Sequence, residues 1–121
     1  MVHVLIADDD HDSAETLAEL LELLAGPLRC TLAFDGIGVL AAATSHGSTH
    51  DAVITDIEMP RMDGLTAANL IRSSLGEATP VLIAVTGVLG VAKLAAINQV
   101  FDHVLQKPIR IEELVDILDE L

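Results

Sequence analysis

The sequence is short of aromatic residues and of positive charge. Its 121 residues include neither tryptophan nor tyrosine and only two phenylalanines, so any core has to be aliphatic. Six lysines and arginines stand against 19 aspartates and glutamates. Nucleic acid is bound through clustered basic residues, and an anionic membrane surface repels an acidic chain. We therefore expect neither nucleic acid nor a membrane among its partners.

Cysteine and long apolar runs are equally scarce. Cys30 is the single cysteine, so an internal disulfide is impossible, and its apolar neighbours predict a buried structural thiol. The apolar run at the N-terminus lacks a basic segment before it and meets acidic residues after seven positions. Such a run is neither a signal peptide nor a membrane span. By elimination we expect a cytoplasmic protein.

What the sequence does have is an alternation of short apolar runs with helical patterns. Hydrophobic residues make up 51% of the chain, which suits one domain with one sizeable core. Strands are predicted at residues 3–7, 29–33, 52–55, 80–85 and 103–105, and helices at 12–25, 36–45, 65–75, 89–99 and 111–121. Five strand–helix units predict a parallel sheet with helices on both faces. We expect residues 1–121 to form a single domain without an output domain.

Local patterns predict how the helices begin and which faces they bury. Asp12 is expected to cap the first helix, with Glu15 completing a capping box, and Asp63 is expected to cap the third. The fourth helix carries Lys93 as its single charge, which leaves open whether it is well buried or forms a face for a partner. The residues expected to point inward are Leu17, Leu20, Leu21 and Leu24 in the first helix, and Ile37, Leu40 and Ala41 in the second.

Polar residues follow four of the predicted strands at the point where each strand ends. Because ligands of parallel α/β sheets bind beyond the carboxyl ends of the strands, these residues are expected to meet at one edge. Asp10 is set apart from them as a solvated residue of the loop or of the helix start. The set comprises Asp8 and Asp9 after the first strand, Asp56 after the third, Thr86 after the fourth and Lys107 after the fifth.

These residue types together indicate phosphoryl-transfer chemistry. Carboxylates that lie close together repel one another, and a divalent cation relieves the repulsion. Ligands that are all oxygen favour Mg²⁺, whereas zinc would need a cysteine or histidine pair, which is missing near these strand ends. A lysine and a hydroxyl bind phosphoryl oxygens, and a carboxylate is a nucleophile. The scattered histidines are expected to be structural or surface residues: His3, His11, His46, His50 and His103.

Four stretches of the sequence carry a family resemblance. "VLIADDD", "VITDIEMPRMDG", "IAVTG" and "LQKPI" occur in an order and at spacings that resemble the receiver domain of response regulators in two-component signalling. The resemblance spans Val2 to Leu121. It implies a flavodoxin-like (βα)5 fold, with a doubly wound parallel five-stranded sheet in the order 2-1-3-4-5. The ending "FDHVLQKP" favours the receiver of a hybrid histidine kinase.

The resemblance implies a phosphoacceptor switch rather than a multiple-turnover enzyme. Asp56 would take a phosphoryl group from a phosphohistidine of a histidine kinase or histidine phosphotransfer protein. Thr86 would bind a phosphoryl oxygen and move on activation, and Lys107 would pair with the phosphoryl group or with Asp56. Pro108 follows that lysine in the family motif, often through a cis bond. The surface formed by the fourth helix, fifth strand and last helix would then change toward a downstream protein.

The resemblance also implies a magnesium site. Asp9 would bind Mg²⁺ directly and Asp8 through water, with Asp56 and the backbone carbonyl of Glu58 completing the ligands. Glu58, together with Val88, would also flank the path of a water that hydrolyses the acyl phosphate.

The sequence departs from the family pattern at the position three before Lys107. Val104 stands there in place of the usual tyrosine or phenylalanine, and Phe101 lies in a different register. Gly87 is a milder change, because alanine is common after the threonine. The departure at Val104 keeps open a second hypothesis, a protein-binding module of the same fold that works without phosphorylation. A small phosphatase is a third, although the chain has no room for a substrate cap.

Overall fold

The sheet has five parallel strands, as the sequence predicts. The computed structural model describes residues 1–87 and 90–121. In that part of the chain, the strands pair in the order β2-β1-β3-β4-β5, and every neighbouring pair is parallel. The predicted fold class and strand order are therefore confirmed. The strands are β1 (Val2–Ala7), β2 (Leu28–Ala33), β3 (Ala52–Asp56), β4 (Val81–Thr86) and β5 (His103–Gln106).

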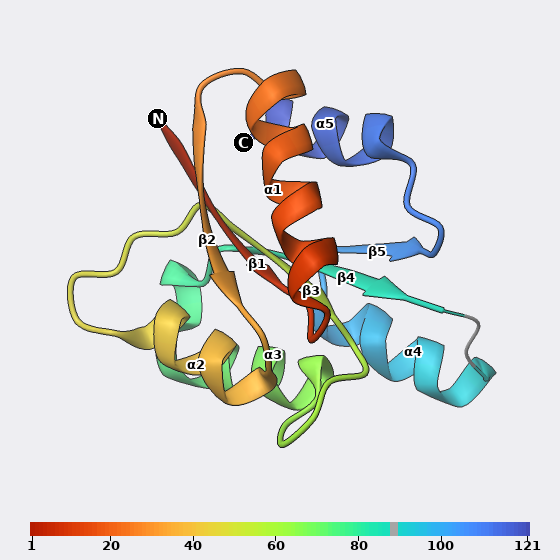
Figure 1. Ribbon diagram of the computed structural model, residues 1–121. Helices are drawn as coiled ribbons and strands as arrows, with labels where there is room; N and C mark the ends of the chain where they lie inside the picture. The colour runs from red at the N-terminus through yellow and green to blue at the C-terminus, as the bar shows by residue number, and fades with distance from the viewer. Residues whose placement is uncertain (88–89) are drawn as a thin grey trace.

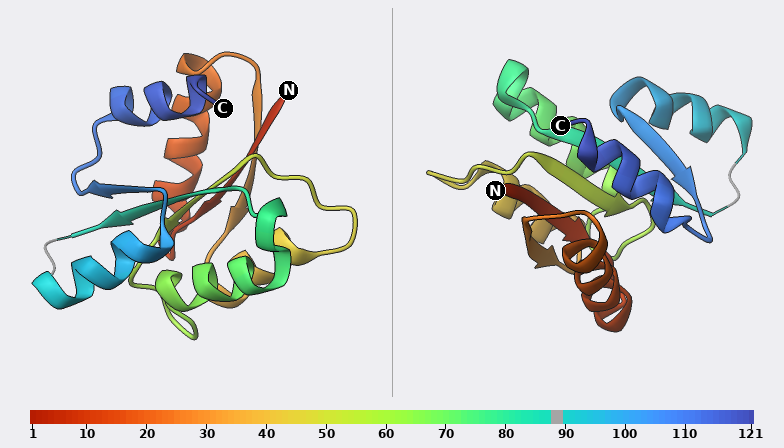
Figure 2. Two further views of the ribbon diagram at one scale, coloured as in Figure 1. Left: turned by 180° about the vertical axis from the view of Figure 1, so that it is seen from behind. Right: turned by 90° about the horizontal axis from the view of Figure 1, so that it is seen from above.

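Helices cover both faces of this sheet (Figure 1). The view from above in Figure 2 separates two helical layers, with α1 and α5 on one side and α2, α3 and α4 on the other. A single 3₁₀ turn, η1 (Gly76–Ala78), follows α3. This arrangement is the doubly wound architecture that the alternation of strands and helices predicts. The helices are α1 (His11–Leu24), α2 (Gly36–Thr44), α3 (Gly64–Leu75), α4 (Val91–Val100) and α5 (Ile111–Asp119).

Alternate side chains of the central strands enter two separate cores. Leu5 and Val53 lie in the core beneath α2, α3 and α4. Val4 and Ile54 lie in the core beneath α1 and α5. Because β1 and β3 are buried on both faces, their sequences read as continuous apolar runs rather than as alternating ones.

The first helix begins one residue before the position that the sequence predicts. Asp10 is its N-cap, and its Oδ1 accepts hydrogen bonds from the backbone N–H groups of Asp12 (3.0 Å) and Ser13 (3.3 Å). The prediction that Asp12 caps the helix is therefore wrong, whereas the placement of Asp10 at the helix start is confirmed. Asp12 lies in the first turn, where its negative charge interacts favourably with the positive end of the helix dipole. Asp63 caps α3 as predicted, since its Oδ1 accepts from the N–H of Thr66 at 2.7 Å.

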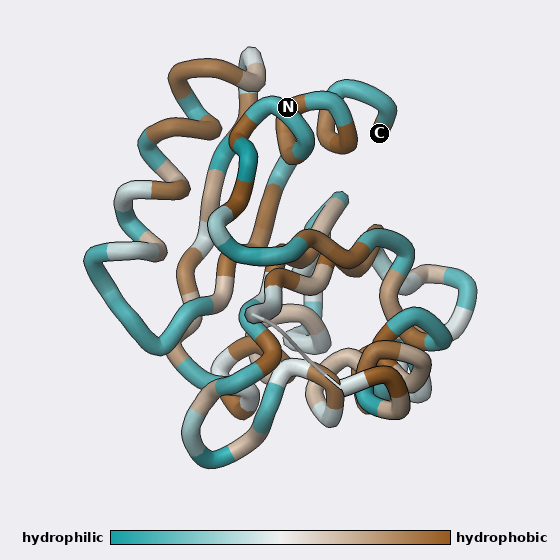
Figure 3. The backbone as a smooth tube through the Cα atoms, turned by 90° about the vertical axis from the view of Figure 1, so that its right-hand side faces the viewer, coloured by the Kyte–Doolittle hydropathy of each residue, from teal (hydrophilic) through white to brown (hydrophobic). Residues whose placement is uncertain are grey.

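The buried faces of α1 and α2 are built on smaller residues than predicted. Apolar and polar segments alternate along α1 (Figure 3), but its centre against the sheet is Ala14, Ala18 and Leu21. Small side chains let the helix axis approach the strands, so the leucines beside them are displaced outward. The predicted inward residues that the structure leaves exposed are Leu20, Leu24, Ile37 and Ala41, while Leu17 and Leu40 are half-buried. In α2 the buried residues are Gly36, Val39 and Ala43.

The fourth helix is not well buried, which removes one of the two alternatives for it. Among its described residues, Ile97 is the buried one, whereas Val91 is 86% exposed and Leu94 is 39% exposed. The helix begins after its N-cap Gly90, and the predicted start at Leu89 lies outside the described residues. The low amphipathicity of its sequence therefore reflects apolar residues on the outer surface.

The structure bears on two further expectations, the burial of Cys30 and the lack of a membrane span. Cys30 on β2 is half-buried rather than buried, and burial, reinforced by the carboxylate of Glu22, raises the pKa of its thiol to about 11. In the described residues, the helices are all too short or too polar to traverse a bilayer.

Candidate functional site

The ends of four strands bring the predicted site residues to one edge of the sheet. Asp56 and Thr86 are the last residues of β3 and β4, so they belong to the ladder instead of following it as predicted. Asp8 and Lys107 come directly after β1 and β5. The backbone N–H of Lys107 donates to the carbonyl of Thr86 at 2.8 Å, and that of Asp8 donates to the carbonyl of Ala33 at 3.1 Å. The backbones that carry the site are thus fixed by sheet hydrogen bonds.

Asp56 and Lys107 form an ion pair at the centre of this edge. Lys107 Nζ donates to Asp56 Oδ2 at 2.9 Å. The Asp56 side chain is only 9% exposed, whereas that of Lys107 is 45% exposed, so the lysine reaches in from the solvent. The hydrogen bond to Asp56 raises the pKa of Lys107, while partial burial works against it. The lysine therefore remains an ammonium beside a nearly buried carboxylate.

Three carboxylates meet beside this ion pair. One oxygen each from Asp8, Asp9 and Asp56 lies within 4.8 Å of the others. Burial raises the pKa of Asp8, and the charges of Asp56 and Asp9 add to the effect, against the N–H of Asp10 and the ammonium of Lys107. The Asp10 N–H donates to Asp8 Oδ1 at 2.9 Å, which fixes one oxygen of that carboxylate. The donor set is oxygen alone and carries excess negative charge, so it fits a hard divalent cation such as Mg²⁺.

A small pocket connects the acidic residues to the ammonium. It measures about 30 Å³, which exceeds the space that one water needs. A larger hollow of about 380 Å³ lies at the opposite end of the sheet, between His3, Arg29 and Asp51. The smaller pocket is the one at which two of the carboxylates, Asp8 and Asp56, and the ammonium of Lys107 meet. Its lining residues include Ile6, Asp8, Leu17, Asp56, Lys107 and Ile109.

Of the remaining predicted site residues, the structure describes some and leaves others as predictions. Thr86 is 4% exposed and lies one residue beyond Val85, which pairs with Asp56 across β3 and β4. Glu58 is exposed in the loop after β3, and the role of its carbonyl stays a prediction. The Lys107–Pro108 bond is cis. Val88, predicted to flank the water path, lies outside the described residues.

The loop between β3 and α3 holds contacts that the sequence interpretation missed. A side chain at Gly64 would place a Cβ only 2.2 Å from the carbonyl oxygen of Asp56, so the loop returns tightly against Asp56. Arg61 in the same loop forms an ion pair with Asp35 at the start of α2. The signal available for the first contact was a glycine directly after a capping aspartate. The second joins residues 26 positions apart and has no local signal.

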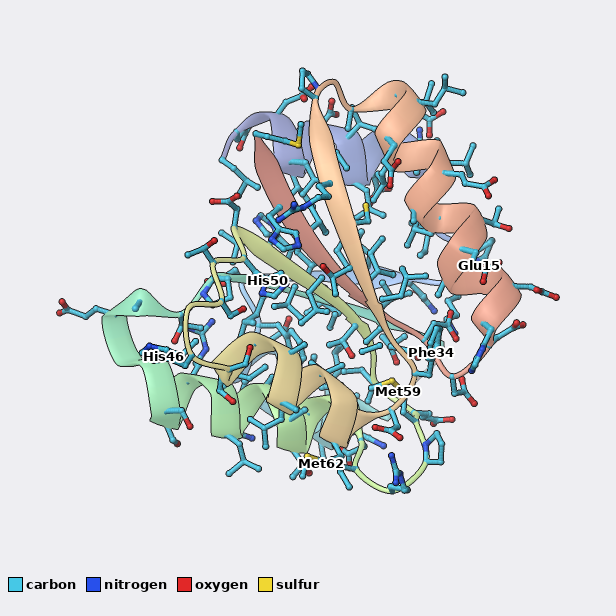
Figure 4. The ribbon with its side chains drawn as sticks, turned by 60° about the vertical axis from the view of Figure 1, so that its left-hand side comes forward. Glu15, Phe34, His46, His50, Met59 and Met62 are labelled. Carbon is cyan, nitrogen blue, oxygen red and sulfur yellow. The ribbon has the colours of Figure 1, made fainter. Side chains whose placement is uncertain are left out.

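Two of the histidines, His3 and His50, make structural contacts, as expected for them. The rings of His3 and His50 lie 4.2 Å apart, and His3 Nε2 is 2.6 Å from the hydroxyl of Thr31. His46 and His50 come from the segment before β3, whereas Met59 and Met62 belong to the loop after it (Figure 4). His50 thus lies at the opposite end of β3 from Asp56.

Comparison with known proteins agrees with this geometry. The family model for the response regulator receiver domain matches residues 4–119. This chain belongs to that family. Receiver domains act in two-component signalling, and solved ones share the fold over nearly the whole chain. The receiver domain of Francisella response regulator 1452 is 26% identical, with a TM-score of 0.82 over 99% of this chain and 98% of that one.

A second solved receiver domain bears on the acidic cluster. The receiver domain of the sensor histidine kinase PA1611 from Pseudomonas aeruginosa PAO1 has a magnesium ion coordinated in its active-site cleft. It is 26% identical to this chain, with a TM-score of 0.83 over 98% of this chain and 95% of that one.

Curated relatives are longer than this receiver domain. The response regulator MprA of Mycobacterium ulcerans is 32% identical over 94% of this chain, which spans 47% of that protein. The osmosensing histidine protein kinase SLN1 of Saccharomyces cerevisiae is 29% identical over 98% of this chain, which spans 10% of that protein. The same domain thus occurs both in a response regulator and in a histidine kinase.

Proposed function

We propose that this receiver domain is a phosphoacceptor switch that takes a phosphoryl group on Asp56. The donor would be a phosphohistidine of a histidine kinase or histidine phosphotransfer protein. The observation that carries the proposal is a nearly buried carboxylate whose Oδ2 accepts from Lys107 Nζ at 2.9 Å, directly beside the carboxylates of Asp8 and Asp9. A carboxylate held between an ammonium and a cation site is equipped to attack phosphorus.

The groups that would hold Mg²⁺ are the carboxylates of Asp9 and Asp56 and the backbone carbonyl of Glu58, with the carboxylate of Asp8 acting through water. The mutual closeness of the three carboxylates supports this assignment. When bound, the ion would supply positive charge against the phosphoryl oxygens. Asp8 and Asp9 would hold it beside Asp56.

The transfer step conserves atoms and charge. A carboxylate oxygen of Asp56 forms a bond to phosphorus as the bond from phosphorus to the histidine nitrogen breaks. The bonding electrons return to the imidazole, which takes a proton from solvent. Lys107 then pairs with a phosphoryl oxygen, and Thr86 donates its hydroxyl hydrogen to another. The single charge of the carboxylate is replaced by a phosphoryl group of about −1.5 to −2.

The new charge would be read out on the surface of α4, β5 and α5. Thr86 ends β4, directly before the segment that leads to α4, so its movement would act there first. The exposed Val91 and Leu94 on α4 suit contact with a downstream protein. The surface can respond only as far as phosphorylation interacts differently with its two conformations.

Val104 supports the second candidate function, a binding module that works without phosphorylation. Its side chain is half-buried against the core beneath α2, α3 and α4, where Phe101 is also buried. Valine has no large ring to move between a buried and an exposed position. In this candidate, the α4–β5–α5 surface would bind its partner regardless of the state of Asp56.

Incubation with acetyl phosphate and Mg²⁺, followed by intact-mass measurement, tests the proposal. The switch predicts one added phosphoryl group that is absent in Asp56→Asn and absent after chelation of the metal. Failure to form an adduct with acetyl phosphate or with a phosphorylated histidine phosphotransfer protein would favour the binding module. Multiple turnover of a phosphomonoester would instead indicate a phosphatase.

A further inference from the structure

The loop after Asp56 is closed at its base by backbone contacts. The N–H of Gly64 donates to the carbonyl of Ile57 at 2.8 Å, and the close approach of Gly64 to the Asp56 carbonyl leaves no space for a side chain. The intervening residues include Glu58, whose carbonyl is a proposed metal ligand. The base of the loop is thus anchored beside the acceptor residue, while its tip projects beyond the sheet edge (Figure 1).

The tip of the loop holds a strained backbone. The N–H of Met62 donates to the carbonyl of Pro60 at 2.8 Å, which closes a three-residue turn around Arg61. Arg61 has a φ of 67°, a value that favours glycine over residues with a side chain. A strained turn of this kind persists only where its surroundings hold it.

An ion pair with Asp35 holds this turn. The guanidinium of Arg61 donates from Nε at 2.9 Å and from Nη2 to the same Asp35 oxygen. Asp35 is itself fixed, because its other oxygen accepts from the N–H of Gly38 at 2.7 Å as the N-cap of α2. The N–H of Gly38 and the guanidinium of Arg61 both lower the pKa of Asp35, so the carboxylate stays charged. The strained turn is therefore bound to a rigid helix start.

The loop after β3 and the start of α2 also touch through their backbones. A Cβ on Gly36 would fall 2.0 Å from the carbonyl oxygen of Met62, so the start of α2 lies directly against the loop. Gly36 permits the approach that brings Arg61 within reach of Asp35. The loop after β3 is thus attached to the start of α2 as well as to Asp56.

We propose that Arg61 is a positioning residue for the metal site. Its ion pair with Asp35 holds the loop so that the carbonyl of Glu58 and the carboxylate of Asp56 keep the spacing that Mg²⁺ requires. This inference rests on the proposed phosphoacceptor function, because it concerns the ligands assigned there. Its consequence is that loss of the ion pair weakens Mg²⁺ binding although Arg61 belongs neither to the metal ligands nor to the phosphoacceptor set.

The sign of the effect separates positioning from simple electrostatics. Removal of a positive charge near three carboxylates would by itself attract Mg²⁺ more strongly. Positioning predicts the opposite, a weaker affinity by about tenfold, at the lower end of the losses seen when residues that orient metal ligands are changed. The informative variant is Arg61→Gly, because it removes the guanidinium that pairs with Asp35 and glycine adopts the positive φ without strain.

An NMR titration of Mg²⁺ into the whole chain, with a thermal melt of each variant, tests the proposal. Arg61→Gly should raise the Mg²⁺ dissociation constant about tenfold without lowering the melting temperature. Arg61→Lys should retain part of the affinity that Arg61→Gly loses. Asp35→Asn removes the other partner of the ion pair but keeps a capping side chain for α2. The double variant Arg61→Gly/Asp35→Asn should bind Mg²⁺ as Arg61→Gly does, since both substitutions remove the same ion pair. Lys93→Gln on α4 removes one positive charge elsewhere and measures the plain charge effect.

The outcomes distinguish this inference from the proposed function. Equal or tighter Mg²⁺ binding by Arg61→Gly would overturn the positioning role, while the phosphoacceptor function could still stand. Weaker binding by a domain that accepts no phosphoryl group would support the positioning role and refute the acceptor function. A wild-type chain that fails to bind Mg²⁺ would overturn both.

Discussion

Replacement of Asp8 by asparagine should stabilise the domain in the absence of metal. One oxygen of each of the three carboxylates lies within 4.8 Å of the others. At this separation, a pair of like charges costs about 1 kcal/mol in water and about 3 kcal/mol at the effective dielectric of a protein surface. Because Asp8 is half-exposed and Lys107 offsets part of the repulsion, we expect a gain of about 1 kcal/mol. That corresponds to a rise of roughly 3–6 °C in melting temperature for a domain of this size.

Magnesium should reduce the stability advantage of Asp8→Asn over the wild type. At ten times its dissociation constant, Mg²⁺ would stabilise the wild-type domain by about 1.4 kcal/mol. Asp8→Asn would gain less, because it lacks one charged ligand. Thermal melts of both proteins in chelator and in Mg²⁺ therefore measure the two effects separately. A melting temperature that Mg²⁺ leaves unchanged, but that nickel or zinc raises, would contradict the choice of metal.

The pH dependence of the Asp8→Asn effect has a defined sign. In the folded state the pKa of Asp8 is raised, so its ionised form costs stability above that pKa. As the pH falls through the raised pKa, the folded protein takes up a proton and the cost disappears. The advantage of Asp8→Asn should therefore be largest near neutral pH and shrink in acid.

Asp10→Asn is the matched control for Asp8→Asn. It removes the same charge two residues away but keeps an N-cap for α1. The N–H of Ser13 lowers the pKa of Asp10, so its ionised form is favourable, and the substitution should give no gain in stability. Equal stabilisation by both substitutions would refute the argument, because it would show a response to net charge alone. So would an Asp8→Asn protein less stable than the wild type in chelator.

Three further predictions concern packing, the ion pair and the thiol. Gly64→Ala should cost about 1–3 kcal/mol in urea unfolding, because its Cβ would meet the Asp56 carbonyl, whereas Gly87→Ala, with open space around it, should be nearly neutral. Lys107→Ala should abolish or strongly slow phosphoryl uptake in the mass assay, because it removes the ammonium that pairs with Asp56. Cys30 should react slowly with iodoacetamide at neutral pH and faster as the pH approaches the pKa of about 11.

The fold and the convergence of the site could be predicted because both depend on local patterns. Strands buried on both faces leave unbroken apolar runs, and a parallel sheet brings the ends of such runs to one edge. Asp56 and Lys107 are 51 residues apart, yet Asp56 ends β3 and Lys107 directly follows β5, and the family resemblance implies that they pair. The parallel topology predicts that the strand ends meet at one edge, and the resemblance supplies the strand order and the pairing.

The predictions of the helix cap and of the buried helix faces were wrong where tertiary packing decides between residues that the local sequence favours equally. Asp10 and Asp12 are both good N-cap residues, and which of them caps α1 depends on where β1 ends. Leu20 lies beside the buried face of α1, but Ala14 and Ala18 set the distance to the sheet, and the leucine is left outside. The ion pair of Arg61 with Asp35 depends on the contact between two loops, to which neither sequence segment points by itself.

The placement of the site residues limits the routes by which phosphorylation can change the outer surface. Asp56 and Thr86 are buried and hydrogen-bonded within the ladder, so a shift of either strand would disturb both cores. Packed cores resist such shifts, whereas segments with few buried contacts change at low cost. The described part of α4 buries Ile97 alone, which makes this helix the element that can respond most easily. We therefore expect amide exchange to increase or decrease first in α4 on phosphorylation. A change confined to α1 and α5 would contradict this route.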